Sequence, residues 1–454
     1  MSSVMERATA ERNFGDIVET GRVHSAYYSD EDVFEAELKH IFYGYWVYVG
    51  HESEIPNAGD YQLKEIGRLP VIMARDKEGG INVMLNRCRH RGVAVANQIS
   101  GNTEAFRCIF HAWTYRIDGK LLGVPLPEGY GPDFKMDDWG LLHVPRMGAY
   151  RGFVFASLNP NVVDFDEYLG PAKPHIDAFC EASPLGKVQL TAGTLKSRYL
   201  GNWKSNGNDG YHPAFLHRSV GQAVHWADPN QHNTILDVKE HAGARAYELG
   251  NGHVRLATEV HVGMNGIPER GFVKDNSEAM VRAQAEYQRL MREAYGDKAD
   301  QKITDWDPHM HVFPNLRVSG SSIEVLHPRS AGVTDLVTYP APLAGVPKEI
   351  NTIRLRGTEW FNSMGGVGVP DDLEAHRRSQ IAHRVPVDPW VLSNRGLNRE
   401  QTDPATGQTY GILSDEQPYR GFAKHWKVVM STPVPELDHL STTWAQQHGE
   451  SNSR

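Results

Sequence analysis

The chain has 454 residues, which is long enough for two or three domains. Its net charge of −9 argues against nucleic acid as a partner. No apolar run reaches the roughly 18 residues of a transmembrane helix, so we expect no membrane span. Residues 1–16 do not have the pattern of a signal peptide, and three cysteines are too few for a disulfide framework. We therefore expect a cytoplasmic protein.

The N-terminal part predicts one helix followed by a β-rich region. The helix begins near Ser29-Asp-Glu-Asp32, where a side chain that can cap the helix is followed by acidic residues in the first turn. Its apolar stripe consists of Val33, Phe34, Leu38, Ile41 and Phe42. Strands over 69–75 and 81–85 flank turn residues, which predicts a hairpin, and 116–120 is a second hairpin turn. Residues 46–165 are therefore expected to form a small all-β domain.

Two arms in this region, Cys88-Arg-His90 and Cys108-Ile-Phe-His111, are separated by seventeen residues. Two thiolates and two imidazoles can hold a two-iron, two-sulfur cluster, with both cysteines on one iron and both histidines on the other. Such a Rieske-type cluster passes single electrons. A structural zinc site is the alternative, because zinc also binds two cysteines and two histidines. Zinc fingers usually pair cysteine with cysteine and histidine with histidine, whereas each arm here has one of each.

The remainder of the chain predicts a larger α+β domain. A long amphipathic helix is expected over 276–294, ended by Gly296, with strands around it such as 316–325 and 335–339. His309-Met-His311 is expected to be packing on a strand rather than a metal pair, and Cys180 a buried thiol. No Gly-x-Gly-x-x-Gly motif follows a predicted strand, so we do not expect nicotinamide or flavin to bind this chain.

An electron-transferring cluster needs an acceptor, and the candidate is one segment: Asp209-Gly-Tyr-His212-Pro-Ala-Phe-Leu-His217. Histidines five residues apart would lie about 140° apart on a regular helix. Pro213 disfavours helix at His212 and can begin a helix after it, so both rings can face one metal. A carboxylate from the helix start Pro370-Asp-Asp-Leu-Glu374 would complete an Fe(II) site with open positions. Helix capping is the alternative role for these residues.

These motifs, in this order and at these distances, resemble the large (alpha) subunit of Rieske-type aromatic ring-hydroxylating oxygenases. The resemblance covers about residues 22–435, and 37–42, 51–56 and 370–374 look most similar to the benzoate, toluate and anthranilate dioxygenase branch. It implies an α+β fold with a Rieske [2Fe-2S] domain at 46–165. A catalytic mononuclear-iron domain would occupy 166–454, with an antiparallel sheet and helices in a helix-grip-like arrangement. The helical segment 1–45 would belong to the catalytic domain.

The resemblance also implies a role for each site residue. The cluster would be held by Cys88, His90, Cys108 and His111. The mononuclear non-haem Fe(II) would be held by His212, His217 and Asp372, and Asp371 is then expected to cap its helix. Asp209 would bridge the two metal sites of neighbouring subunits by hydrogen bonds to one histidine of each site.

The implied function is NADH- and O2-dependent cis-dihydroxylation of an aromatic substrate, with an aromatic carboxylic acid as the first choice. Electrons would come from a flavin-containing reductase, with or without a ferredoxin. The assembly would be an α3 homotrimer or α3β3 with a beta subunit. The alternatives are a Rieske monooxygenase (a salicylate-type hydroxylase or an O-demethylase), a non-catalytic Rieske electron carrier, and a zinc-stabilised binding protein.

One segment departs from the family pattern. The family has seven residues between its Asn-Trp-Lys and Asp-x-Tyr-His motifs, whereas only Ser205-Asn-Gly-Asn208 intervenes here. The three missing residues amount to nearly one helical turn. The histidines keep their mutual spacing, so we expect iron binding to be intact and the geometry around Asp209 to differ. Residues 419–426 also differ from the benzoate enzymes.

Overall fold

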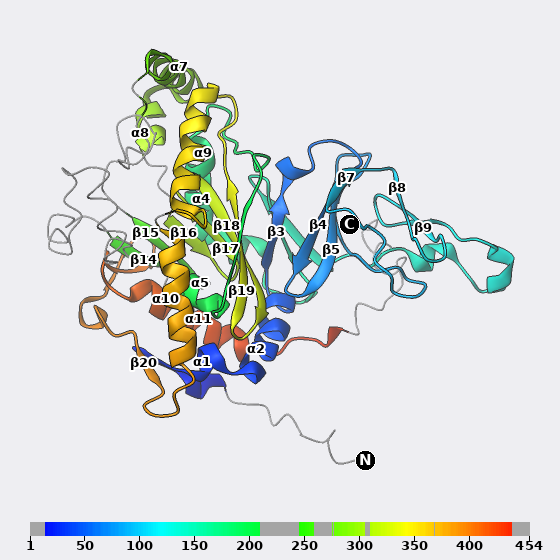
Figure 1. The fold of residues 1–454 in the computed structure, drawn as a ribbon, viewed down its shortest axis with the longest axis horizontal. Helices are drawn as coiled ribbons and strands as arrows, with labels where there is room; N and C mark the ends of the chain where they lie inside the picture. The colour runs from blue at the N-terminus through cyan, green and yellow to red at the C-terminus, as the bar shows by residue number, and fades with distance from the viewer. Residues whose placement is uncertain are drawn as a thin grey trace.

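The computed structural model describes residues 14–208, 245–257, 275, 277–304, 309–366 and 368–437. Figure 1 shows a β-rich part, drawn in blue to cyan, that extends to one side of a larger part built around a long sheet. No helix among these residues is long and apolar enough to cross a membrane.

The predicted N-terminal helix packs into a core that both parts share. It comprises α1 (Ala26–Ser29) and α2 (Glu31–Glu37) and continues as a π-helical turn (Leu38–Tyr43). The carboxylate of Asp30 caps α2 by accepting hydrogen bonds from two backbone N–H groups. All five residues of the predicted apolar stripe are buried, which confirms its inward face. They join a core that contains side chains of both parts, including Val71, Val83 and Trp203.

Small antiparallel sheets form the β-rich part. The predicted hairpin is confirmed with the predicted bounds, and the predicted turn 116–120 connects two strands. One sheet has the order β6-β5-β4-β7, the second β10-β9-β8, and the third β11-β12-β3. Their strands are β3 (Val47–His51), β4 (Asp60–Ile66), β5 (Leu69–Arg75), β6 (Ile81–Leu85), β7 (Ser100–Asn102), β8 (Ala105–Arg107), β9 (Thr114–Arg116), β10 (Leu121–Gly123), β11 (Arg146–Tyr150) and β12 (Phe153–Ser157).

The larger part is built on an antiparallel sheet that has nine strands within the described residues, in the order β13-β19-β18-β17-β16-β15-β14-β22-β21. The longest pairing joins β18 to β19, from Ser322 opposite Pro340 to Ser330 opposite Val333. The strands are β13 (Leu195–Tyr199), β14 (Arg245–Gly250), β15 (His253–Ala257), β16 (His309–Val312), β17 (Leu316–Ser319), β18 (Ser322–Ser330), β19 (Val333–Pro340), β21 (Gln401–Thr402) and β22 (Thr409–Ile412).

The prediction of one strand over 316–325 is wrong. The chain turns at Gly320, whose φ is +57°, and β17 pairs with β18 as a hairpin. Glycine adopts this left-handed conformation without the steric cost of a Cβ. Buried residues continue on both sides of the turn, so the pattern of apolar residues in the sequence does not reveal the turn. The predicted strand 335–339 is confirmed within β19.

Helices cover the large sheet. In Figure 1, α9 (Lys348–Asn362) and α10 (Val369–Ala382) run across it, and α11 (Gln417–Met430) packs against β14 and β15. The predicted helix 276–294 is confirmed as α7 (Glu278–Tyr295), with Ser277 as its cap. The other helices are α3 (Phe165–Leu169), α4 (Lys173–Glu181), α5 (Trp203–Asn208) and α8 (Ala299–Thr304), and a small sheet joins β1 (Val18–Glu19), β2 (Arg22–His24) and β20 (Trp390–Leu392).

Candidate metal centres

The two ligand arms have matching backbone hydrogen bonds. In each arm the cysteine N–H donates to the carbonyl five residues later, over 2.8 Å at Cys88 and 2.9 Å at Cys108. The N–H four residues after each cysteine donates back to its carbonyl, from Gly92 (2.9 Å) and from Ala112 (3.0 Å). Both of these residues have positive φ, +76° and +55°. The arms are therefore two copies of one turn, each presenting one thiol and one imidazole.

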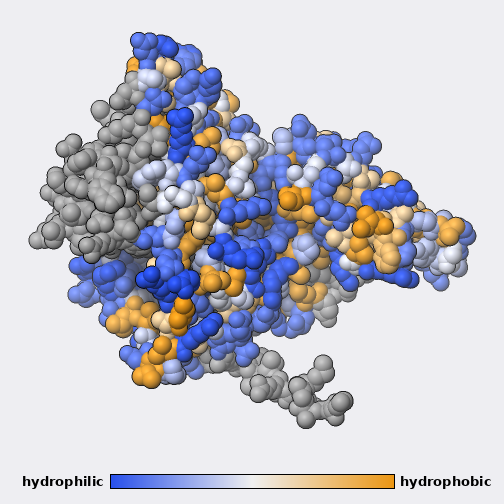
Figure 2. Space-filling view, in the orientation of Figure 1, coloured by the Kyte–Doolittle hydropathy of each residue, from blue (hydrophilic) through white to orange (hydrophobic). Residues whose placement is uncertain are grey.

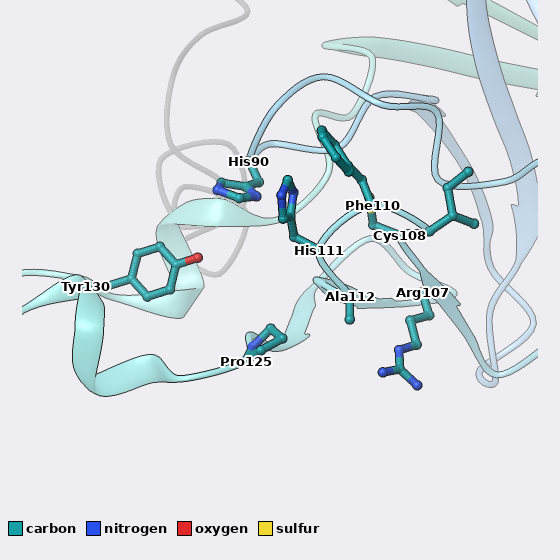
Figure 3. A pocket seen from close by; sticks show the side chains of 9 residues that line it. His90, Arg107, Cys108, Phe110, His111, Ala112, Pro125 and Tyr130 are labelled. Carbon is teal, nitrogen blue, oxygen red and sulfur yellow. The ribbon is translucent and has the colours of Figure 1, made fainter.

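The four predicted cluster ligands lie together. Cys88 and Cys108 are 2% and 3% exposed, whereas His90 and His111 are partly exposed. The two imidazole rings are 4.7 Å apart and lie side by side in Figure 3. Nδ1 of His111 is buried and has no hydrogen-bond partner within the described part of the chain. This set fits a cluster whose thiolates lie inside the domain and whose imidazoles face outward.

Two aromatic residues support the ligands. The Tyr115 hydroxyl accepts a hydrogen bond from the Arg89 N–H (3.0 Å) and lies 3.3 Å from Sγ of Cys88. Its proton can therefore be donated to the thiolate, and hydrogen bonds to cluster sulfurs tune the reduction potential. Trp113 stacks on His90, with centroids 5.2 Å apart and planes at 6°. Sequence reasoning missed Tyr115, although it is the inward-facing aromatic residue of β9.

A cavity of about 640 Å³ opens beside the ligands, lined by both histidines, Cys108 and Tyr130. Neighbouring apolar side chains are strongly exposed: 75% for Ile109, 57% for Phe110 and 75% for Leu126. Figure 2 shows hydrophobic surface gathered on this extended part of the molecule. Clustered exposed apolar side chains at a functional site are typical of an interaction surface.

Of the predicted iron-site residues, the structure describes Asp372 alone. Asp209, His212 and His217 lie outside the described residues. Asp372 lies in the first turn of α10, and its Oδ1 atom is buried. The prediction that Asp371 caps this helix is wrong. The helix begins at Val369, so Asp371 already lies inside the first turn, and no side chain caps the N-terminus.

Buried hydrogen bonds join the helix before Asp209 to the helix that carries Asp372. The N–H of Asn202, just before α5, donates to Oε1 of Gln380 on α10 (3.1 Å). The side-chain amides of Asn202 and Gln380 both donate to the carbonyl of Tyr28, over 2.9 Å and 3.1 Å. Sequence reasoning missed Gln380. It lies eight residues after Asp372, at the spacing that places both on one helix face.

A buried ion pair holds the start of α5. The Glu37 carboxylate binds the Lys204 ammonium and accepts hydrogen bonds from the indoles of Trp203 (2.8 Å) and Trp426 (2.7 Å). Both charged side chains are 0% exposed. Burial raises the pKa of Glu37 and lowers the pKa of Lys204 to about 8, because desolvation disfavours both charges. The three donors around the carboxylate offset that cost.

Two predictions outside the metal centres concern buried residues. His311 is buried, and its Nε2 lies 2.8 Å from the Pro314 carbonyl, while Nδ1 of His309 lies 3.2 Å from the Ser319 hydroxyl. These bonds support a packing role for the pair. Cys180 is 0% exposed, which confirms a buried thiol.

Comparisons with known proteins identify the domain that carries the two ligand arms. A family model described as the Rieske [2Fe-2S] domain matches residues 45–135. The large subunit of 2-halobenzoate 1,2-dioxygenase from Burkholderia cepacia is 31% identical, over 81% of this chain and 78% of that protein. The alpha subunit of N,N-dimethyl phenylurea N-demethylase from Sphingobium sp. is 34% identical, over 92% of this chain and 94% of that protein.

A solved structure of naphthalene 1,2-dioxygenase with indole bound in the active site superposes with a TM-score of 0.79 at 21% identity, covering 96% of this chain and 99% of that chain. This match confirms the predicted α+β fold of a small β domain and a larger sheet-and-helix domain. The Rieske domain match confirms the cluster prediction, and the zinc alternative is therefore wrong.

Proposed function

Because this chain belongs to the family of large (alpha) subunits of Rieske aromatic ring-hydroxylating dioxygenases, we propose that it is the oxygenase component of a multicomponent dioxygenase. It uses NADH-derived electrons and O2 to cis-dihydroxylate an aromatic substrate. The observation that carries this proposal is the pair of matching turns that bring two cysteines and two histidines together. They occur in a chain that matches dioxygenase large subunits over most of its length. A non-catalytic electron carrier would not need the large second domain.

The cofactors are a Rieske [2Fe-2S] cluster and a mononuclear iron, which supply single electrons and O2 activation. We assign the cluster to Cys88, His90, Cys108 and His111. Tyr115 holds a proton near the Cys88 thiolate, and Trp113 orients His90.

We assign the mononuclear iron to His212, His217 and Asp372, with Asp209 linking the two metal sites across a subunit boundary. The hydrogen bond between Asn202 and Gln380 links the start of α5 to α10, the helix that carries Asp372. It supports the assignment because α5 ends at Asn208, directly before Asp209 in the sequence.

An aromatic carboxylic acid is the proposed substrate class, on the basis of the 2-halobenzoate enzyme among the relatives. Oxidative N-demethylation is a second candidate, favoured by one observation. The N-demethylase relative matches more of this chain, at higher identity, than the 2-halobenzoate enzyme does. That reaction would place this protein with the Rieske monooxygenases.

The proposed partners are a flavin-containing reductase, with or without a ferredoxin, and a beta subunit in an α3β3 assembly, or an α3 homotrimer without one. The relatives are named as a large subunit and a subunit alpha, which supports a second subunit. The exposed apolar side chains beside the cluster, Ile109, Phe110 and Leu126, support contact with a neighbouring subunit or electron donor. The chain's three cysteines are buried and none is in a disulfide, which is consistent with a cytoplasmic location.

The test is turnover of the purified protein, supplied with reductase and NADH under ¹⁸O2, on benzoate, 2-chlorobenzoate and N,N-dimethyl-N′-phenylurea. We expect a cis-diol that carries two labelled oxygen atoms from one O2 molecule. A demethylated urea with formaldehyde would favour the second candidate. Cluster reduction without any oxygenated product from these or other aromatic substrates would contradict both candidates.

A further inference from the structure

The chain after β10 forms a mostly exposed segment over residues 125–139, which we call the aromatic arm. It projects beyond β9 at the far end of the β-rich part (Figure 1). The arm carries three aromatic residues, Tyr130, Phe134 and Trp139, and of these Tyr130 is 38% and Trp139 36% exposed. Large aromatic side chains gathered on one exposed segment are typical of a contact surface.

The aromatic arm packs on Trp113, the residue that stacks on the cluster ligand His90. Trp113 is 2% exposed, and its indole N–H donates to the Tyr130 hydroxyl over 3.0 Å. Its ring centroid lies 6.0 Å from that of Trp139 and 5.2 Å from that of His90. One buried indole therefore connects a cluster ligand to an exposed indole at the surface.

Trp139 lies outside the cavity that opens beside the cluster. Of the described residues, those that line the cavity include both ligand histidines but not Trp139. The guanidinium of Arg89 lies 5.5 Å from the Trp139 ring centroid and donates to the Gly140 carbonyl over 3.2 Å, which holds the indole beside the first ligand arm. A neighbouring subunit that reaches a cluster histidine would cover the cavity rather than Trp139.

The arm is also acidic around Trp139. Residues 133–139 include three aspartates and one lysine. Asp137 lies 3.3 Å from the ammonium of Lys120, whereas Asp133 is exposed and makes no ion pair within the described part of the chain. An acidic surface attracts a partner that carries a basic one and raises the rate of their association.

We propose that an electron-donor protein docks on the surface around Trp139, and that each electron passes through Trp139 and Trp113 to His90. The donor is the reductase of the proposed function, on which this inference rests, and it has a basic surface around its flavin or iron–sulfur group. That group loses one electron, one of the two ferric ions of the cluster gains it, and no bond forms or breaks. Closely packed rings favour this path, because electron tunnelling weakens steeply across gaps between atoms.

The test is stopped-flow reduction of the cluster in the complete protein, followed by visible absorbance. The probes are a flavin-containing reductase of the benzoate dioxygenase type with NADH, and dithionite, which needs no docking surface. Trp139→Leu should slow reduction by the reductase at least about tenfold, the usual loss when an aromatic anchor of an interface is removed. Reduction by dithionite and the cluster EPR signal should not change, and Trp139→Phe, which keeps a ring, should retain most of the rate. Reduction of Trp139→Leu by the reductase at the wild-type rate would overturn the path.

A charge reversal tests the docking surface separately. Asp133→Lys should raise the reductase concentration needed for half-maximal rate by about two- to fivefold at low salt, without lowering the limiting rate. The effect should fade at high salt, because exposed charges are screened. Glu78→Lys is the matched control, since Glu78 is exposed in the turn between β5 and β6, outside the arm. Equal effects of the two reversals, or none from either, would overturn the docking site, also where Trp139→Leu fails to hold its cluster.

The outcome is distinguishable from that of the proposed function. Reduction that depends on Trp139 in a protein that oxygenates no aromatic substrate would support the docking surface and contradict the proposed function. Normal product formation with reduction that is independent of Trp139 and Asp133 would contradict the docking surface alone.

Discussion

Replacing Glu37 by glutamine should destabilise the protein by about 3–5 kcal/mol near neutral pH, the usual cost of breaking a buried ion pair from one side. The variant leaves the Lys204 ammonium fully buried without a counter-charge. Glutamine has nearly the same shape, but its amide has one acceptor oxygen where the carboxylate has two, so it can keep only one of the indole hydrogen bonds of Trp203 (to Oε2) and Trp426 (to Oε1). The measured loss should therefore report the missing charge together with one indole hydrogen bond, and not a cavity.

The stability that the variant loses relative to the wild type should become smaller as the pH rises. The wild-type Lys204 pKa is about 8 against an ordinary 10.5, and Glu37 is what keeps it from falling further. In the variant this pKa drops below 8, so the folded lysine releases its proton earlier than in the wild type. Between the folded and unfolded pKa values the unfolded chain binds more protons, so stability rises with pH by at most about 1.4 kcal/mol per unit. The raised pKa of Glu37 also makes the difference between wild type and variant smaller at high pH. The wild type loses stability as the pH rises through the raised pKa of Glu37, and the variant has no carboxyl group there to titrate.

Urea denaturation followed by tryptophan fluorescence at pH 6 and pH 9 measures both effects, since Trp203 and Trp426 contact the pair. Glu19→Gln, which removes a partner of an exposed ion pair with Arg22, is the control and should cost less than about 1 kcal/mol. A loss below about 1 kcal/mol for Glu37→Gln, or an equal loss at the two pH values, would refute the reasoning.

The remaining predictions concern the metal centres. Cys108→Ala should abolish the Rieske EPR signal while the mononuclear iron persists in metal analysis; an unchanged signal would contradict the cluster assignment. Asp372→Ala should lose the mononuclear iron and activity, whereas Asp371→Ala should keep most of its iron, since neighbouring side chains in the first turn of α10 point in different directions and only one can face the metal. The reverse result would shift the ligand by one residue. Asp209→Ala should retain both metals and a reducible cluster, yet reoxidise far more slowly with substrate and O2; reoxidation at the wild-type rate would rule out a bridging role.

Local chemistry made the cluster predictable from sequence. Cysteine and histidine have few roles at that spacing, and each arm is a short turn whose hydrogen bonds join residues at most five positions apart. The N-terminal helix and the hairpin 69–85 were predictable for the same reason, because capping, periodicity and turn residues act over a few positions. The turn at Gly320 was missed because buried residues continue on both sides of it.

Contacts between distant segments were decided by tertiary structure alone. Nothing near Glu37 in the sequence indicates that Lys204 and Trp426 will surround its carboxylate, 167 and 389 positions away. The bond between Asn202 and Gln380 spans 178 positions and depends on how α10 lies against the start of α5. Burial gives these groups their importance, since a polar side chain removed from water needs a partner, and that partner is chosen by packing rather than by sequence neighbours.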